Sequence, residues 1–207
     1  MDQKYVIFDM DGTLVDSMPV WNQLGYEYLT KHGVMDSYEA IRQETDALTL
    51  SEAIFLYAER FGFDPSKAGS EMTDMMKVHY GTDIPVKPGI PALLEDLKRK
   101  GVRMCVASAS SEDLILTCLN HLNLSDYFEF VLSCETLETQ KREPKIYLEA
   151  ARRFQADPKD IAVYEDSLAA VQTAKKAGFY TVGVFSKEEE DHQKLIKQTA
   201  DEYIDVD

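Results

Sequence analysis

The stretch that most constrains this chain is Asp9-Met10-Asp11-Gly12-Thr13, which follows the apolar run Tyr5-Val6-Ile7-Phe8. The apolar run predicts a short buried strand over residues 4–9. Two carboxylates at the end of a strand repel each other unless a proton or a cation neutralises one of them. Oxygen-rich sites of this kind suit Mg²⁺. The alternative is a turn whose aspartates cap a helix and bind water.

Length and composition narrow the class of protein. The 207 residues suit one domain, or one domain with an insertion. No apolar run reaches the roughly 18 residues of a membrane span, and the N-terminus leaves no room for a signal peptide, so no membrane partner is expected. The net charge of −15 argues against nucleic acid as a partner. It leaves an anionic substrate open, because salt screens exposed charges beyond about 8 Å.

The three cysteines, Cys105, Cys118 and Cys134, are odd in number and lack the spacing of metal ligands. They are therefore expected to be reduced, buried thiols, which fits a cytoplasmic location.

Residues 16–83 form a block in which apolar residues recur only at helical spacing. The segment Asp16-Ser17-Met18-Pro19 predicts a helix start, with a capping side chain and then proline in the first turn. Gly33 is expected to end that helix. The methionines Met72, Met75 and Met76 are interpreted as core packing. The proline-rich segment 84–91 is the expected return linker.

After this linker, helical and apolar extended segments alternate along the chain. The predicted strands are 102–107, 130–132, 161–164 and 181–185, with a short edge strand at Tyr203-Ile204. This alternation predicts an α/β fold with a doubly wound parallel sheet. Ligands of such sheets bind outside the carboxyl ends of the strands.

Polar groups follow four of the predicted strands: Asp9 and Asp11, then Ser108, then Lys141, then Glu165 and Asp166. Each one alone has an ordinary interpretation as a strand-ending hydroxyl, a solvated charge or a helix cap. At successive strand ends of one sheet, they together predict a functional site.

In this order the four segments resemble the four motifs of the haloacid dehalogenase superfamily of phosphohydrolases. The resemblance implies a Rossmann-like core over residues 1–15 and 86–207 and an inserted helical cap over residues 16–85. It looks closest to the branch that holds beta-phosphoglucomutase-like enzymes and sugar-phosphate phosphatases. Linkers near residues 14–19 and 84–88 would then let the cap close over the site and exclude water.

The resemblance also implies roles for the acidic residues. Asp9 would be the nucleophile, and Asp11 would protonate the leaving group and then deprotonate a water. Mg²⁺ would be held by Asp9, by the backbone carbonyl of Asp11, by Asp166, and by Glu165 directly or through water. Chemistry supports this, because a carboxylate can form an acyl-phosphate and split one hard step into two.

The remaining implied residues would bind substrate. Ser108, Ala109 and Lys141 would hold the phosphoryl group, which a fixed ammonium stabilises. The third motif departs from the usual K-P-x-P-D-x-Y, because Arg142 and Lys145 replace a proline and an aspartate. In the cap, Arg42, Thr45 and Thr49 are the expected substrate contacts. The alternative for Arg42 is a solvated helix charge.

The leading hypothesis is therefore a Mg²⁺-dependent phosphatase of a small phosphorylated metabolite, a sugar or polyol phosphate, acting as a monomer or weak homodimer. Thr13 favours phosphatases within this branch. One alternative is a beta-phosphoglucomutase-like phosphomutase, and another is an inactive binding protein with the same fold.

Overall fold

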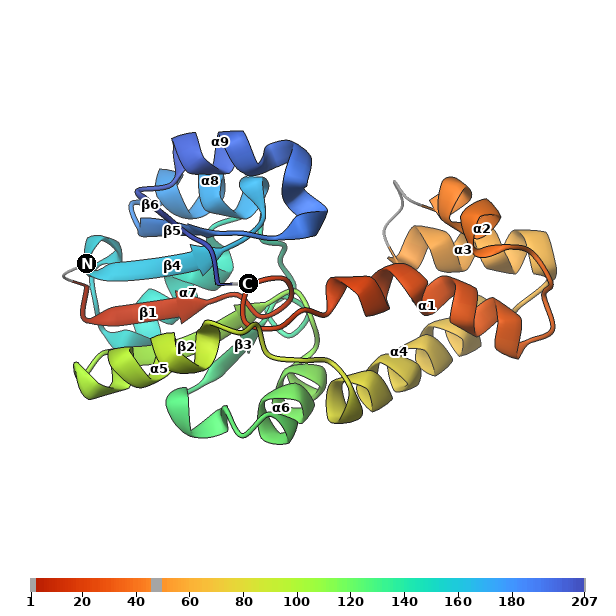
Figure 1. Ribbon diagram of the computed structural model, residues 1–207, viewed down its shortest axis with the longest axis horizontal. Helices are drawn as coiled ribbons and strands as arrows, with labels where there is room; N and C mark the ends of the chain where they lie inside the picture. Colours follow the sequence, from red (N-terminus) through yellow and green to blue (C-terminus); the bar gives the residue numbers. More distant parts are fainter. Residues whose placement is uncertain (1–2, 46–49, 207) are drawn as a thin grey trace. The chain divides into compact units, whose positions relative to one another are not determined.

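The computed structural model describes residues 3–45 and 50–206 and divides into two compact units. The first, called the sheet unit, combines Met1–Asp16 with Pro85–Asp207. The second, called the helical unit, is Ser17–Ile84. Figure 1 shows strands only in the sheet unit.

Within the described residues, one parallel sheet has the strand order β3-β2-β1-β4-β5-β6. The strands are β1 Tyr5–Phe8, β2 Arg103–Ser108, β3 Val131–Ser133, β4 Ile161–Glu165, β5 Tyr180–Val184 and β6 Glu202–Ile204. The predicted doubly wound α/β fold is confirmed. Phe8 pairs with Val106 of β2 and with Tyr164 of β4, so the ends of β1, β2 and β4 meet at one sheet edge.

Helices cover both faces of the sheet, and α5 and α7 lie on opposite sides of the strands in Figure 1. The helices of this unit are α5 Ile90–Arg99, α6 Glu112–His121, α7 Lys145–Phe154, α8 Leu168–Lys176 and α9 Gln193–Thr199. Tyr147 and Phe154 of α7 are buried in one core cluster with Ile7 and Val163. Burial on both faces explains why the strands are almost continuously apolar.

The described part of the helical unit consists of α1 Met18–Lys31, α2 Tyr38–Thr45, α3 Leu50–Phe61 and α4 Pro65–Thr82. Helix α4 packs against α1 and α3. Met72, Met75 and Met76 are buried, which confirms their predicted core role. The Trp21 indole donates to the Tyr80 hydroxyl at 3.1 Å and joins α1 to α4.

The helix start predicted at Asp16-Ser17-Met18-Pro19 is confirmed, but Ser17 does not supply the expected capping bond. Ser17 precedes α1, but within the described chain its side chain makes no capping hydrogen bond. Its φ and ψ of −93° and −16° are helical, whereas a capping side chain needs an extended backbone. Pro19 lies in the first turn as expected, and Gly33, with φ of 81°, follows the last residues of the helix.

Two further expectations concern membrane-spanning helices and the cysteines. No described helix combines the length and apolar character needed to cross a membrane. Cys105, Cys118 and Cys134 are buried free thiols, as predicted.

Packing around Gly25 yields a prediction for the stability of the helical unit. A Cβ at Gly25 would lie 2.2 Å from the Tyr57 hydroxyl oxygen. Gly25→Ala should therefore destabilise the protein by about 1–3 kcal/mol, although alanine is ordinarily the better helix former. Thermal unfolding followed by circular dichroism would measure this, and the effect should shrink in a Tyr57→Phe background.

Gly69 of α4 is the matched control. A Cβ there meets only Ile54 Cδ1, at 3.6 Å, among the described residues, so Gly69→Ala should stabilise the protein. Equal stabilisation by both substitutions would contradict the packing argument.

Candidate active site

The turn after β1 is held by its own backbone. The amides of Leu14 and Val15 donate to the Met10 carbonyl at 2.9 and 3.1 Å, and the Gly12 amide donates to the Val15 carbonyl at 2.9 Å. Gly12 has φ of 84°, and a Cβ there would lie 2.2 Å from Asp166 Oδ2. Only glycine therefore allows this turn to approach Asp166 so closely.

A group of buried carboxylates lies where β1 and β4 end. One oxygen from each of Asp9, Glu165 and Asp166 lies within 4.8 Å of the others. Because the strand order reverses between these neighbouring strands, they flank the switch point at which ligands of such sheets bind. The side chain of Asp11 is not part of this group.

Lys141 supplies an ammonium to the carboxylate group from the loop after β3. Its Nζ donates to Asp9 Oδ1, and to Glu165 Oε1 at 2.5 Å. The Tyr147 hydroxyl also donates to Glu165 Oε1, at 3.2 Å. Lys141 is thus a partner of the predicted site residues rather than a solvated surface charge.

The electrostatics of this group favour a bound cation. Burial raises the pKa of Asp9 well above its usual range; Lys141 opposes the shift, whereas Glu165 and Asp166 add to it. Burial and then the Glu165 charge raise the pKa of Asp166 to about 7. The Lys141 charge can compensate only one of the three carboxylates. An all-oxygen donor set with excess negative charge fits Mg²⁺.

Asp11 is held by two serines at the end of β2. Ser108 Oγ and Ser110 Oγ donate to Asp11 Oδ2 at 3.2 and 2.8 Å, and the Ser110 amide donates to Ser108 Oγ at 3.0 Å. The structure therefore brings predicted residues Asp11 and Ser108 together. No role was predicted for Ser110, which lies in the bend that follows β2.

Two hydroxyls orient Asp166. Thr13 Oγ1 donates to Asp166 Oδ1 at 3.3 Å, and the Ser186 side chain also hydrogen-bonds to Asp166. Ser186 is buried and follows β5. No role was predicted for Ser186, because a single serine after a strand carries no signal of its own.

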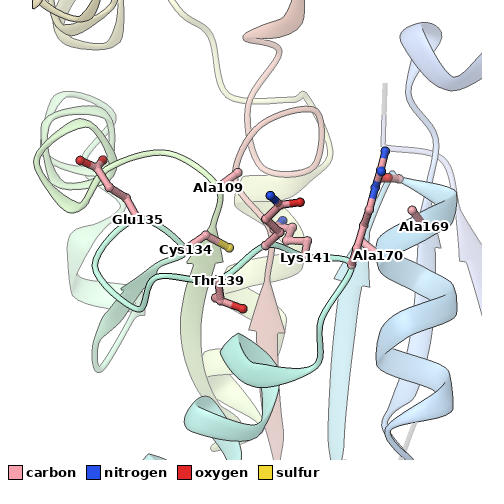
Figure 2. Close-up of a pocket in the computed structure, with 10 residues that line it drawn as sticks. Ala109, Cys134, Glu135, Thr139, Lys141, Ala169 and Ala170 are labelled. Carbon is pink, nitrogen blue, oxygen red and sulfur yellow. The ribbon is translucent and has the colours of Figure 1, made fainter. Parts of the chain in front are cut away.

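A pocket of about 440 Å³ opens beside Lys141. Figure 2 shows Ala109, Cys134 and Lys141 from the loops after the strands, facing Ala169 and Ala170 of α8. The remaining lining residues are Glu135, Thr139, Gln140, Arg142 and Ser167. The pocket thus contains two predicted substrate-binding residues, Ala109 and Lys141, and Arg142 from the altered motif.

The predicted contacts of the cap lie on α2 or beyond it. Arg42 is exposed, and the Thr45 hydroxyl donates to the Ile41 carbonyl at 3.0 Å. Thr49 lies outside the described residues. The substrate-binding roles of these residues stay predictions.

Comparisons with known proteins agree with this architecture. Residues 3–178 match the family described as "Hydrolase: haloacid dehalogenase-like hydrolase". The chain is 25% identical over 185 residues to a phosphorylated carbohydrates phosphatase of Thermotoga maritima, covering 84% of this chain and 81% of that protein. It is 27% identical over 195 residues to hexitol phosphatase B of Escherichia coli (strain K12), covering 92% and 87%.

Similarity also extends to solved structures. A crystal structure of a Thermotoga maritima protein provisionally named beta-phosphoglucomutase matches with a TM-score of 0.85. The two chains are 24% identical, and the match covers 98% of this chain and 94% of that chain. At this identity the likeness shows the fold alone.

The raised pKa of Asp166 predicts how the metal-free protein responds to pH. The folded protein holds this proton up to about pH 7, whereas an ordinary aspartate loses it near 3.8. The free energy of unfolding should therefore fall as pH rises from about 4 to about 7. In EDTA, Asp166→Asn should raise the melting temperature by at least about 2 °C at pH near 8, and change it little near pH 5.

Exposed Asp74 of α4 gives a control. Asp74→Asn should leave the difference in melting temperature between the two pH values unchanged. A melting temperature that Asp166→Asn alters equally at both pH values would contradict the prediction.

Proposed function

The chain belongs to the haloacid dehalogenase-like hydrolases, and from this and the geometry of its site we propose that it is a Mg²⁺-dependent phosphatase of a sugar or polyol phosphate. It would act through an aspartyl-phosphate intermediate. The observation that carries the proposal is the contact of the Lys141 ammonium with Asp9 inside a buried carboxylate group. The names of the two phosphatase relatives support the substrate class.

The side chains of Asp9, Asp166 and Glu165, with the backbone carbonyl of Asp11, would hold the metal ion. When bound, Mg²⁺ neutralises charge on the phosphoryl oxygens. Lys141 contributes a second positive charge to the same group, so a dianionic phosphate would meet fewer uncompensated carboxylates.

In the first step, a carboxylate oxygen of Asp9 attacks phosphorus and forms a new O–P bond. The bond from phosphorus to the leaving oxygen breaks, and protonated Asp11 gives that oxygen its proton. The Ser110 hydroxyl holds the Asp11 carboxyl group in place for this transfer, which leaves the Ser108 hydroxyl to turn to the phosphoryl group.

In the second step, a water attacks the phosphorus of the aspartyl phosphate. Asp11 takes a proton from this water, and the bond between phosphorus and the Asp9 oxygen breaks. Phosphate leaves, Asp9 is a carboxylate again, and Asp11 is protonated for the next cycle. Lys141 and Ser108 stabilise the phosphoryl oxygens in both steps.

Three finer assignments belong to the same proposal. The helical unit is a cap, and Arg42 and Thr45 on α2 contact the substrate. The protein acts in the cytoplasm, where its buried free thiols would stay reduced. It works as a monomer or weak homodimer.

The test is phosphate release from a panel of sugar, polyol and other small phosphate monoesters, measured with Mg²⁺ and with EDTA. Release should require Mg²⁺ and should fall by at least about 10³-fold in Asp9→Asn, which keeps the size of the side chain but removes the nucleophile. Circular dichroism would confirm that the variant is folded.

Wild-type rates in Asp9→Asn would show that the nucleophile is assigned wrongly. If no monoester releases phosphate, the phosphatase proposal fails. A sugar monophosphate supplied with its bisphosphate would then test for a phosphomutase, and failure of both assays would favour a binding protein.

A further inference from the structure

Lys87 is a buried lysine that the proposed reaction does not use. It lies in the segment that returns to the sheet unit, and only 3% of it is exposed. Its Nζ donates to the Gly12 carbonyl at 3.1 Å and to the Phe185 carbonyl at 2.5 Å. A buried ammonium is unfavourable unless its donors are satisfied, so these two carbonyls help to accommodate the residue.

The two carbonyls belong to two segments whose next residues both contact Asp166. Thr13 follows Gly12, and Ser186 follows Phe185. The hydroxyls of both residues bond to Asp166. The ammonium therefore links the backbones that carry both of these hydroxyls.

Lys87 is also anchored through its own backbone. Its amide donates to the Leu14 carbonyl at 3.0 Å, and the Asp16 amide donates to the Pro85 carbonyl at 3.0 Å. Val15 and Val86 form an antiparallel bridge between these bonds. The start of the lysine side chain is thus fixed beside the turn that its ammonium binds.

We propose that Lys87 is a positioning residue for the metal site, because its ammonium ties the Gly12–Thr13 turn to the Phe185–Ser186 segment and so fixes the hydroxyls that orient Asp166. This inference rests on the proposed function only for the presence of the metal. A lysine suits the task, because its long stem ends in several donors that reach acceptors on two different segments. Methionine has a similar length but leaves both carbonyls without this donor.

Metal binding by the metal-free protein tests the proposal without reference to turnover. Mn²⁺ would be titrated into wild type and Lys87→Met, and free Mn²⁺ would be measured by electron paramagnetic resonance. Loss of a residue that supports a ligand should raise the dissociation constant about tenfold or more. The KM for the best monoester at saturating metal should change by less than about threefold, because Lys87 is proposed to act on the metal ligand and not on substrate binding.

A double-mutant cycle separates positioning from general destabilisation. Thr13→Val and Ser186→Ala each remove one hydroxyl on Asp166 and should each weaken Mn²⁺ binding. In the background that lacks both hydroxyls, Lys87→Met should raise the Mn²⁺ dissociation constant much less than it does in wild type. The reason is that the effects of substitutions within one network are not additive. If Lys87→Met does not fold, the two hydroxyl variants and Lys87→Arg still test the proposal. Lys87→Arg keeps the donors and should retain more affinity than the hydroxyl variants.

Lys175 provides the matched control. It binds Asp201 at 2.8 Å in the sheet unit, and Lys175→Met should leave the Mn²⁺ dissociation constant unchanged. The proposal is overturned if Lys87→Met binds Mn²⁺ as wild type does, if the cycle is additive, or if wild type binds no metal. If wild type binds Mn²⁺ but hydrolyses no monoester, the proposed function fails while the cycle still decides the role of Lys87.

Discussion

Burial of three carboxylates at one sheet edge is the constraint on which the rest of the site depends. Asp9, Glu165 and Asp166 are each less than a tenth exposed, and their oxygens lie close together. In such surroundings the ionised form of a carboxyl group is unfavourable unless a bound proton or a nearby cation neutralises it. Lys141 supplies one such charge, yet burial and the neighbouring carboxylates still raise the pKa values of Asp9 and Asp166.

The parallel sheet makes this arrangement possible. Neighbouring parallel strands end at the same edge, so residues more than 150 positions apart become neighbours after β1 and β4. The same strands are buried on both faces, and their core holds the charged edge in place. The two serines at the end of β2 then hold Asp11 from the other side of β1, so the candidate groups gather from the ends of neighbouring strands of one sheet.

Much of this arrangement could be predicted from the sequence. Apolar runs marked the strands, and alternation with helices indicated parallel pairing. Asp9, Glu165 and Asp166 could be placed because each lies at the end of a strand. The capping bond expected at Asp16-Ser17 is not made by Ser17, because residue type does not determine backbone dihedrals. Ser110, Ser186 and Lys87 had no predicted role, because their contacts join distant positions, such as Lys87 and Phe185, that share neither periodicity nor a motif.

The pairing of the two connecting segments has an evolutionary consequence. The chain leaves the sheet unit at Asp16 and returns at Pro85, and these two residues are joined by a hydrogen bond. The inserted segment therefore begins and ends at neighbouring positions of the sheet unit. Insertions with adjacent ends are the kind that folds tolerate, so helical units of different sequence could be exchanged at this point without altering strand order. If the helical unit is the proposed cap, a new substrate preference could then arise by replacing this unit, while the carboxylates and Lys141 stay unchanged.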